Sequence, residues 1–223
     1  MHFTAPRYVA LCLVVVFAAW LVVAGRSAAL QFNRATLVQH TRTQHGAAGA
    51  QRVERWLAML ERAASEPDVP AQLVVVNAFW NRNVREGVDA AIWKQEDYWA
   101  TPLETLGRGI GDCEDFVIGK YFSLVHLGVP PDRLRLIYVR AQVGGASIAH
   151  MVLGYYTRPD AEPLILDNLR DSIQSAAQRR DLTPVFSFNA DGVYVAGAAR
   201  ASVDRISRWQ GLLLRMQQEG FQP

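Results

Sequence analysis

Apolar positions in the first half of the chain recur with helical spacing. Residues 51–64 carry one stripe of apolar side chains: Val53, Trp56, Leu57 and Leu60. This stripe predicts an amphipathic helix. Residues 71–83 show a similar pattern, and their length favours a helix over a strand. Residues 30–50 are polar and rich in Gly and Ala without a clear period, so no element is predicted there.

Two further helices are predicted from the residues that begin them. Thr101 can cap a helix whose first residue is Pro102, and Glu104 stands where a capping box needs a carboxylate. Asp112 is a favourable N-cap for a second helix, which runs to about Leu127 and is ended by Gly and Pro.

After residue 130 the apolar period changes to two, which is typical of half-buried strands. The predicted elements are strands at 133–141, 150–157 and 163–169, a hairpin of 184–189 with 193–197, and an amphipathic helix at 203–218. Helices followed by strands that pair through short turns indicate an α+β domain with an antiparallel sheet.

Composition and charge limit the classes of protein to which the chain can belong. Its 223 residues suit one domain, and half of them are apolar. The formal net charge is +2, from 23 basic and 21 acidic residues, and no block of Lys or Arg stands out. Nucleic acid is therefore not expected as a partner.

The N-terminus has the features of an export signal. Residues 8–25 form an apolar run that small residues follow, so cleavage after Ala29 is expected. The alternative is an uncleaved membrane anchor, for which this run is short. We therefore expect residues 1–29 to be a signal peptide or anchor, and residues 30–223 to form a single exported domain.

Cys113 is the only cysteine outside this leader, because Cys12 lies within it. Exported proteins usually pair their cysteines, so a single one is a candidate nucleophile. In the first turn of its helix a thiolate is favoured by unpaired N–H groups and the helix dipole. Three neighbouring carboxylates, Asp112, Glu114 and Asp115, oppose this effect. From the sequence alone, these carboxylates can equally serve to cap the helix and to interact favourably with its dipole.

His150 is the candidate base for this thiol. His126 is excluded because it lies 13 residues further along the same helix, about 20 Å from Cys113 along the axis. The remaining histidines lie in the leader or in the segment 30–50, which has no clear period. Taken alone, a histidine such as His150 is more often an ordinary strand residue than a catalytic base.

Asp167 is the candidate partner of His150. The strands that carry the two residues are joined by a short turn and should pair antiparallel. If Tyr156 lies opposite Ala161, paired residue numbers sum to 317, and His150 faces Asp167. Asp167 also interrupts an apolar run, where a charge is costly unless it is paired.

Five stretches of the sequence resemble the bacterial transglutaminase-like cysteine proteinases of the LapG type. They are residues 96–124 with "GDCEDF", 133–139, 150–156 with "HMVL", 164–169 with "LDNL", and 181–189. They follow the family's order and cover most of the chain after about residue 70. The resemblance implies a papain- or transglutaminase-like core, with N-terminal helices and the Cys113 helix packed on the antiparallel sheet.

The resemblance also implies the roles of the site residues. Cys113 would attack the scissile carbonyl, His150 would act as base and then as acid, and Asp167 would orient His150. Backbone N–H groups near Cys113 would meet the oxyanion. Trp99 is a candidate side chain for the same role, although it can equally be a core residue.

Calcium is the cofactor that the resemblance implies, bound beside the nucleophile. By position, the candidate ligands are Asp112, Glu114 and Asp115, whose oxygens are of the kind that Ca²⁺ takes. Backbone carbonyls or water must complete the shell. Bound Ca²⁺ would cancel charge that otherwise raises the pKa of the thiol.

The family's substrates and partner give the remaining expectations. Its members are periplasmic and cut large surface adhesins in their N-terminal region near a di-alanine site, which releases the adhesin and disperses biofilm. The implied partner is an inner-membrane cyclic-di-GMP receptor of the LapD type, which sequesters the protease. Two alternatives stay open: an acyl transferase or amidase with the same Cys-His-Asp triad, and a calcium-responsive binding module without chemistry.

Overall fold

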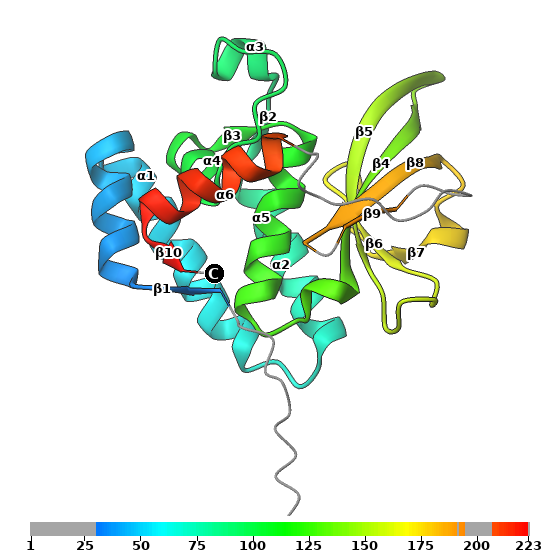
Figure 1. Ribbon diagram of the computed structural model, residues 1–223, viewed down its shortest axis with the longest axis horizontal. Helices are drawn as coiled ribbons and strands as arrows, with labels where there is room; N and C mark the ends of the chain where they lie inside the picture. The colour runs from blue at the N-terminus through cyan, green and yellow to red at the C-terminus, as the bar shows by residue number, and fades with distance from the viewer. Residues whose placement is uncertain (1–29, 191, 195–206, 223) are drawn as a thin grey trace, which may run out of the picture.

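The computed structural model describes residues 30–190, 192–194 and 207–222. Most of its helices come first along the chain, and the main sheet follows them (Figure 1). The helices are α1 Arg34–Ala64, α2 Val69–Asn83, α3 Asp89–Ile92, α4 Pro102–Arg108, α5 Cys113–His126 and α6 Ser207–Glu219. The α+β class predicted from the sequence is confirmed.

The main sheet has six strands in the order β7-β6-β5-β4-β8-β9, and all neighbours are antiparallel. Its strands are β4 Leu134–Val143, β5 Ala146–Tyr155, β6 Leu164–Leu166, β7 Gln174–Ser175, β8 Leu182–Asn189 and β9 Gly192–Tyr194. Two small ladders lie outside this sheet. β1 (Gln31–Phe32) pairs antiparallel with β10 (Phe221–Gln222), and β2 (Arg85–Glu86) pairs parallel with β3 (Ile110–Gly111).

Helix α5 lies at the centre of the molecule, between α1 and the main sheet (Figure 1). Every residue from Glu114 to Val125 is buried, which is expected for a helix covered on all sides. Trp56 of α1 and Trp80 of α2 both donate their indole N–H to the Ser123 hydroxyl, at 2.9 and 3.0 Å. These contacts fix α5, and with it the position of its first residue, Cys113.

The segment 30–50 differs from the sequence prediction, because most of it forms the first half of α1. The side chain of Asn33 caps this helix, which continues through a kink at Gly46, where φ is 73°. Gly49 packs so closely on α4 that a Cβ there would lie 2.9 Å from the carbonyl oxygen of Gly107. Small inward-facing residues give no hydrophobic stripe, so this helix was not visible in the pattern.

The other predicted elements are present, but the strand predicted at 163–169 is reduced to β6, Leu164–Leu166. Residues 51–64 and 71–83 lie in α1 and α2, and both hydrogen bonds of the Thr101–Glu104 capping box begin α4. Strand β5 starts at Ala146 rather than at residue 150. The reason is a two-residue turn at Gly144 and Gly145, whose φ values of 57° and 85° suit a tight hairpin.

Some predictions fall on residues that the structure does not describe. These are the leader or anchor at 1–29, the end of the hairpin at 195–197, and the first turn of the C-terminal helix at 203–206. Across the residues that are described, no helix combines the length and apolar character needed to cross a membrane.

Candidate active site

Cys113 begins α5, and its thiol is half-buried where this helix meets β5. The thiol donates a hydrogen bond to Glu114 Oε2 at 3.0 Å. The backbone N–H of Met151 on β5 faces the Cys113 sulfur closely enough to lower the pKa of the thiol. Cys113, the candidate nucleophile, therefore lies beside Met151, which is the residue after His150.

His150 and Asp167 form the second part of the site. His150 lies on β5, Asp167 directly follows β6, and both are buried. His150 Nε2 and Asp167 Oδ1 are 2.8 Å apart. Because Nε2 is engaged by Asp167, Nδ1 is the ring nitrogen left to serve a thiol.

The strand register behind this contact differs from the prediction. Leu153 pairs with Leu166, so residue numbers sum to 319 and the predicted sum of 317 is wrong. The two side chains still meet, because a shift of two residues leaves both on the same face of the sheet. A shift of one residue would have separated them.

Arg179 completes the surroundings of Asp167 and was not among the candidates from the sequence. It is 2 % exposed, and its Nη2 donates to Asp167 Oδ2 at 2.7 Å. The same guanidinium binds Asp181 through Nε and Nη2. Burial raises the pKa of Asp167, but hydrogen bonds from His150, Leu169 and Arg179 more than offset it and hold the pKa at about 2. Asp167 is therefore an anion with both oxygens engaged.

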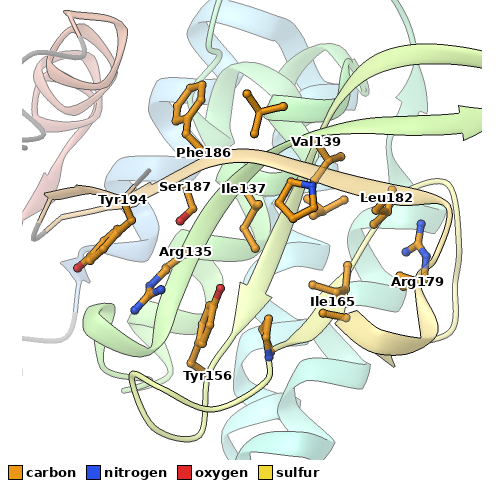
Figure 2. Close-up of a pocket in the computed structure, with 15 residues that line it drawn as sticks. Arg135, Ile137, Val139, Tyr156, Ile165, Arg179, Leu182, Phe186, Ser187 and Tyr194 are labelled. Atoms are coloured by element: carbon orange, nitrogen blue, oxygen red, sulfur yellow. The ribbon is translucent and has the colours of Figure 1, made fainter. Parts of the chain in front are cut away.

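A pocket of about 470 Å³ on the sheet also includes Arg179 (Figure 2). Its floor is a small apolar cluster separate from the main core: Ile137, Val139, Val152 and Ile165. Figure 2 shows Arg179 next to Leu182 at one end and Arg135 toward the other. Cys113 does not line this pocket, so the pocket is not where a scissile bond would meet the thiol.

Asp89, Asp112 and Glu114 form an acidic group beside Cys113. One ligand atom from each lies within 4.8 Å of the others. Asp89 Oδ1 and Asp112 Oδ1 are buried and have no hydrogen-bond partner among the described residues. Burial, followed by the charges of Glu114, Asp115 and Asp89, raises the pKa of Asp112 to about 10. Unpartnered oxygens and mutually repelling carboxylates fit a hard divalent cation.

Asp115 is placed differently from the other sequence candidates for metal binding. Its buried carboxylate accepts the backbone N–H of Ala100 at 2.8 Å and that of Asp112 at 3.4 Å. It therefore holds the turn before α5 and is not part of the acidic group. Asp89, and not Asp115, is the third member of the acidic group. Sequence reasoning missed Asp89 because no motif connects it to Cys113, whereas the β2–β3 ladder brings the two segments together.

The acidic group also affects the state of the thiol. Burial raises the pKa of Cys113, and the charges of Glu114 and Asp112 raise it further, whereas the Met151 N–H lowers it. The thiol form is therefore favoured, and only the thiolate attacks carbonyl carbon efficiently. A cation held by the acidic group would oppose the two carboxylate effects.

Trp99, the sequence candidate for an oxyanion donor, is buried in the core. Its ring stacks on Phe188 with centroids 5.5 Å apart, and its N–H donates to Asp97 Oδ1 at 3.1 Å. In this conformation the indole N–H is already engaged. A role for Trp99 in binding the oxyanion stays a prediction.

The site combines a cysteine at the start of a central helix with a His–Asp pair on an antiparallel sheet. This arrangement is typical of the class of transglutaminase-like cysteine proteinases. The family described as "bacterial transglutaminase-like cysteine proteinase BTLCP" matches residues 44–180. The chain belongs to this family, and it is a cysteine protease.

Solved structures agree with this assignment. LapG of Legionella pneumophila is 36% identical with a TM-score of 0.71, over 82% of this chain and 96% of that chain. Its EGTA-treated form is 36% identical with a TM-score of 0.73, over 84% and 100%. Its calcium-bound form is 38% identical with a TM-score of 0.69, over 80% and 97%. A search of curated proteins found no match. The transglutaminase-like fold predicted from the sequence is confirmed.

Proposed function

We propose that this protease is a calcium-dependent periplasmic endopeptidase that cuts a large surface adhesin in its N-terminal region, near a di-alanine site. Release of the adhesin would promote biofilm dispersal. The observation that carries the proposal is the placement of the acidic group directly beside Cys113, with the His150–Asp167 pair on the adjoining strands. The likeness to LapG, which has a structure named calcium-bound, supports the choice of metal, and the substrate class rests on the resemblance of the sequence to the LapG-type family.

Cys113 is the nucleophile in the proposed mechanism. His150 takes the thiol proton at Nδ1, and the sulfur bonds to the scissile carbonyl carbon. When the tetrahedral adduct collapses, the C–N bond breaks, and His150 returns the proton to the leaving amine. Water, deprotonated by His150, then hydrolyses the thioester and restores the thiol. Asp167 holds the ring through Nε2 and stabilises the imidazolium.

The start of α5 supplies the remaining chemistry. The unpaired backbone N–H groups in its first turn would stabilise the oxyanion. Asp89, Asp112 and Glu114 would hold Ca²⁺, and backbone carbonyls or water would complete its shell. When bound, Ca²⁺ supplies positive charge beside the thiol. Asp115, a ligand candidate from the sequence, would instead position Asp112 through the backbone.

Export and a partner belong to the same proposal. Residues 1–29 would act as signal peptide or anchor, and residues 30–223 would work as one domain in the periplasm. An inner-membrane cyclic-di-GMP receptor of the LapD type would hold the protease away from its substrate. These expectations rest on the apolar run at residues 8–25 and on the resemblance of the sequence to the LapG-type family. Nucleic acid is not proposed as a partner.

Cleavage of an N-terminal adhesin fragment that contains paired Ala residues tests the nucleophile and the metal together. We expect the wild-type protein to cut the fragment near the paired Ala in Ca²⁺ and to stop when EGTA is added. Cys113→Ala should be inactive in both conditions, while its circular dichroism spectrum is unchanged. Cleavage by Cys113→Ala would refute the assigned nucleophile, and full activity in EGTA would refute the calcium dependence.

Asp89→Asn tests the composition of the acidic group. Loss of one charged ligand should raise the Ca²⁺ concentration for half-maximal cleavage by about tenfold or more. The matched control is Glu96→Gln, which changes an exposed carboxylate outside the acidic group. Equal Ca²⁺ dependence of Asp89→Asn and wild type would remove Asp89 from the proposed site.

A further inference from the structure

Six arginines gather on one surface of the helical half of the molecule. They come from α1, α2, β2 and α4, and we call them the arginine face: Arg52, Arg55, Arg62, Arg82, Arg85 and Arg108. Arg52 is half-buried and the other five are exposed. Residues 30–223 contain 21 basic and 21 acidic residues. The cluster is therefore a local separation of charge and not a sign of an overall basic protein.

A hollow of about 390 Å³ lies within the arginine face. Its lining consists of Arg52, Arg55, Arg82, Asn83, Arg85, Arg108 and Gly109, with no carboxylate. Burial lowers the pKa of Arg52, and the like charges of Arg55 and Arg85 lower it further. No carboxylate of the described residues forms an ion pair with any arginine of this face.

An apolar groove of about 700 Å³ adjoins this hollow between α1 and α2. Its apolar lining consists of Ala58, Met59, Val74, Val75, Ala78 and Phe79. Val74 is 58% exposed, although it lies in the middle of α2. Arg55 and Arg82 line both the hollow and the groove, and Arg62 adds a third charge to the groove. The two concave regions thus form one surface with an apolar part and a cationic part.

We infer that this surface docks an acidic, amphipathic segment of another protein. Apolar side chains of the segment would enter the groove, and its Asp and Glu side chains would pair with Arg55, Arg82 and their neighbours. Guanidinium groups bind carboxylates through two parallel hydrogen bonds, which gives direction as well as attraction. A groove between two helices accepts the apolar face of a segment in the same way. Its concavity favours a protein segment over the flat surface of an anionic membrane.

The docking surface is separate from the catalytic centre. Neither the hollow nor the groove is lined by Cys113, His150 or Asp167. A partner bound there would leave the thiol open to substrate. The inference therefore stands independently of the proposed substrate and of calcium, and an inactive Cys113→Ala protein would still bind.

A synthetic 18-residue peptide that is helical, with Leu on one face and Glu on the other, is the probe for this surface. Its affinity for the full chain is measured by fluorescence anisotropy. We expect Arg55→Glu/Arg82→Glu to weaken binding by about tenfold or more, because attraction becomes repulsion. Val74→Ser should weaken binding through the apolar part alone, because it removes apolar surface and adds no charge. The control Arg140→Glu/Arg158→Glu makes the same change of net charge at exposed sites elsewhere and should bind like wild type.

Each result decides for or against the docking surface. Equal losses in the test and control variants would mean that only net charge matters, which would overturn the inference. A scrambled peptide of the same composition that binds equally well would do the same. Binding of phosphatidylglycerol vesicles or a DNA oligonucleotide in place of the peptide would replace the proposed partner with another class. If the double Glu variant fails to fold, Arg55→Gln/Arg82→Gln gives the same comparison with neutral side chains.

Discussion

Asp167 is held from three directions, and this determines what it can do. Its Oδ1 accepts from His150 and from the backbone of Leu169, and its Oδ2 accepts from Arg179. A carboxylate bound in this way cannot rotate, and its depressed pKa keeps it ionised. It can therefore fix the imidazole of His150 in one orientation and one tautomer throughout the reaction.

Replacing Arg179 with Gln should reduce catalysis without removing the nucleophile. The buried carboxylate of Asp167 loses a charged partner, so His150 is less firmly oriented. We expect kcat to fall about tenfold to hundredfold, as for other residues that orient a catalytic side chain, while KM stays nearly constant. Arg179→Lys should restore part of the activity. Arg170→Gln is the control, because Arg170 approaches Asp181 but makes no contact with Asp167. An unchanged kcat in Arg179→Gln would refute the positioning role.

The same variant has a consequence for acid stability. The pKa of Asp167 is about 2 in the folded protein and about 3.9 in an unfolded chain. Its interactions therefore contribute stability above about pH 4 that is lost as the pH falls toward 2. Without Arg179 the pKa of Asp167 rises, so the midpoint of acid unfolding should move to higher pH.

At the residue scale, sequence reasoning reached the residues that lie in regular elements. Cys113 and His150 could be placed because a helix start and a strand can be read from local patterns. Asp89 and Arg179 could not, because each reaches the site through long-range contacts from a segment without periodic pattern. The contacts of Asp115 could not be predicted either, since its position in the sequence gives no indication that its side chain turns toward the backbone of Ala100.

Among the helices and strands, α5 is the element whose packing most restricts substitution. It begins at Cys113, the proposed nucleophile, is buried along almost its whole length, and packs against α2 at Gly119. A Cβ on Gly119 would overlap the ring of Trp80 well inside van der Waals contact. The ring has little freedom to move away, because its N–H is bonded to Ser123 of the same helix.

Gly119→Ala should therefore destabilise the protein, although alanine is usually favoured over glycine in a helix. Overpacking of this kind costs about 1–3 kcal/mol in the free energy of unfolding, which chemical denaturation can measure. Gly211→Ala on α6 is the matched control. A Cβ there has only the Arg215 guanidinium nearby, at 3.6 Å, so the change should be neutral or stabilising by up to about 1 kcal/mol. Equal effects of the two substitutions would show that Trp80 can yield.

At the scale of the whole molecule, metal binding and folding should be coupled. The acidic group joins α3 to the start of α5, and these segments are adjacent only in the folded chain. An ion that binds the native state alone stabilises it by about 2.7 kcal/mol at a concentration one hundred times its Kd. We expect Ca²⁺ to raise the melting temperature and EGTA to reverse the shift. Asp89→Asn should show a smaller shift, and no shift in wild type would contradict a metal site.

The overall architecture was accessible from the sequence, because the change from helical to strand periodicity is a property of the chain itself. Three features were not: the register between β5 and β6, the first half of α1, and the β2–β3 ladder. Register depends on the turn, a helix faced with small residues has no apolar stripe, and two-residue strands are too short to show a pattern.

The pairing of β1 with β10 places the two ends of the described domain at the same end of one antiparallel ladder, since Gln31 lies opposite Gln222. Tension applied between those ends would load the ladder's hydrogen bonds one after another, as in a zipper, and not all at once in shear. The ladder should therefore open at low force. Leu30, which precedes β1, and Phe221, which packs edge-on against Phe32, would then be the first core side chains to leave. A domain held at one end and pulled at the other would next lose the contacts of Leu30 and Phe32 with His126, the last residue of α5, whereas Cys113 lies at the opposite end of that helix.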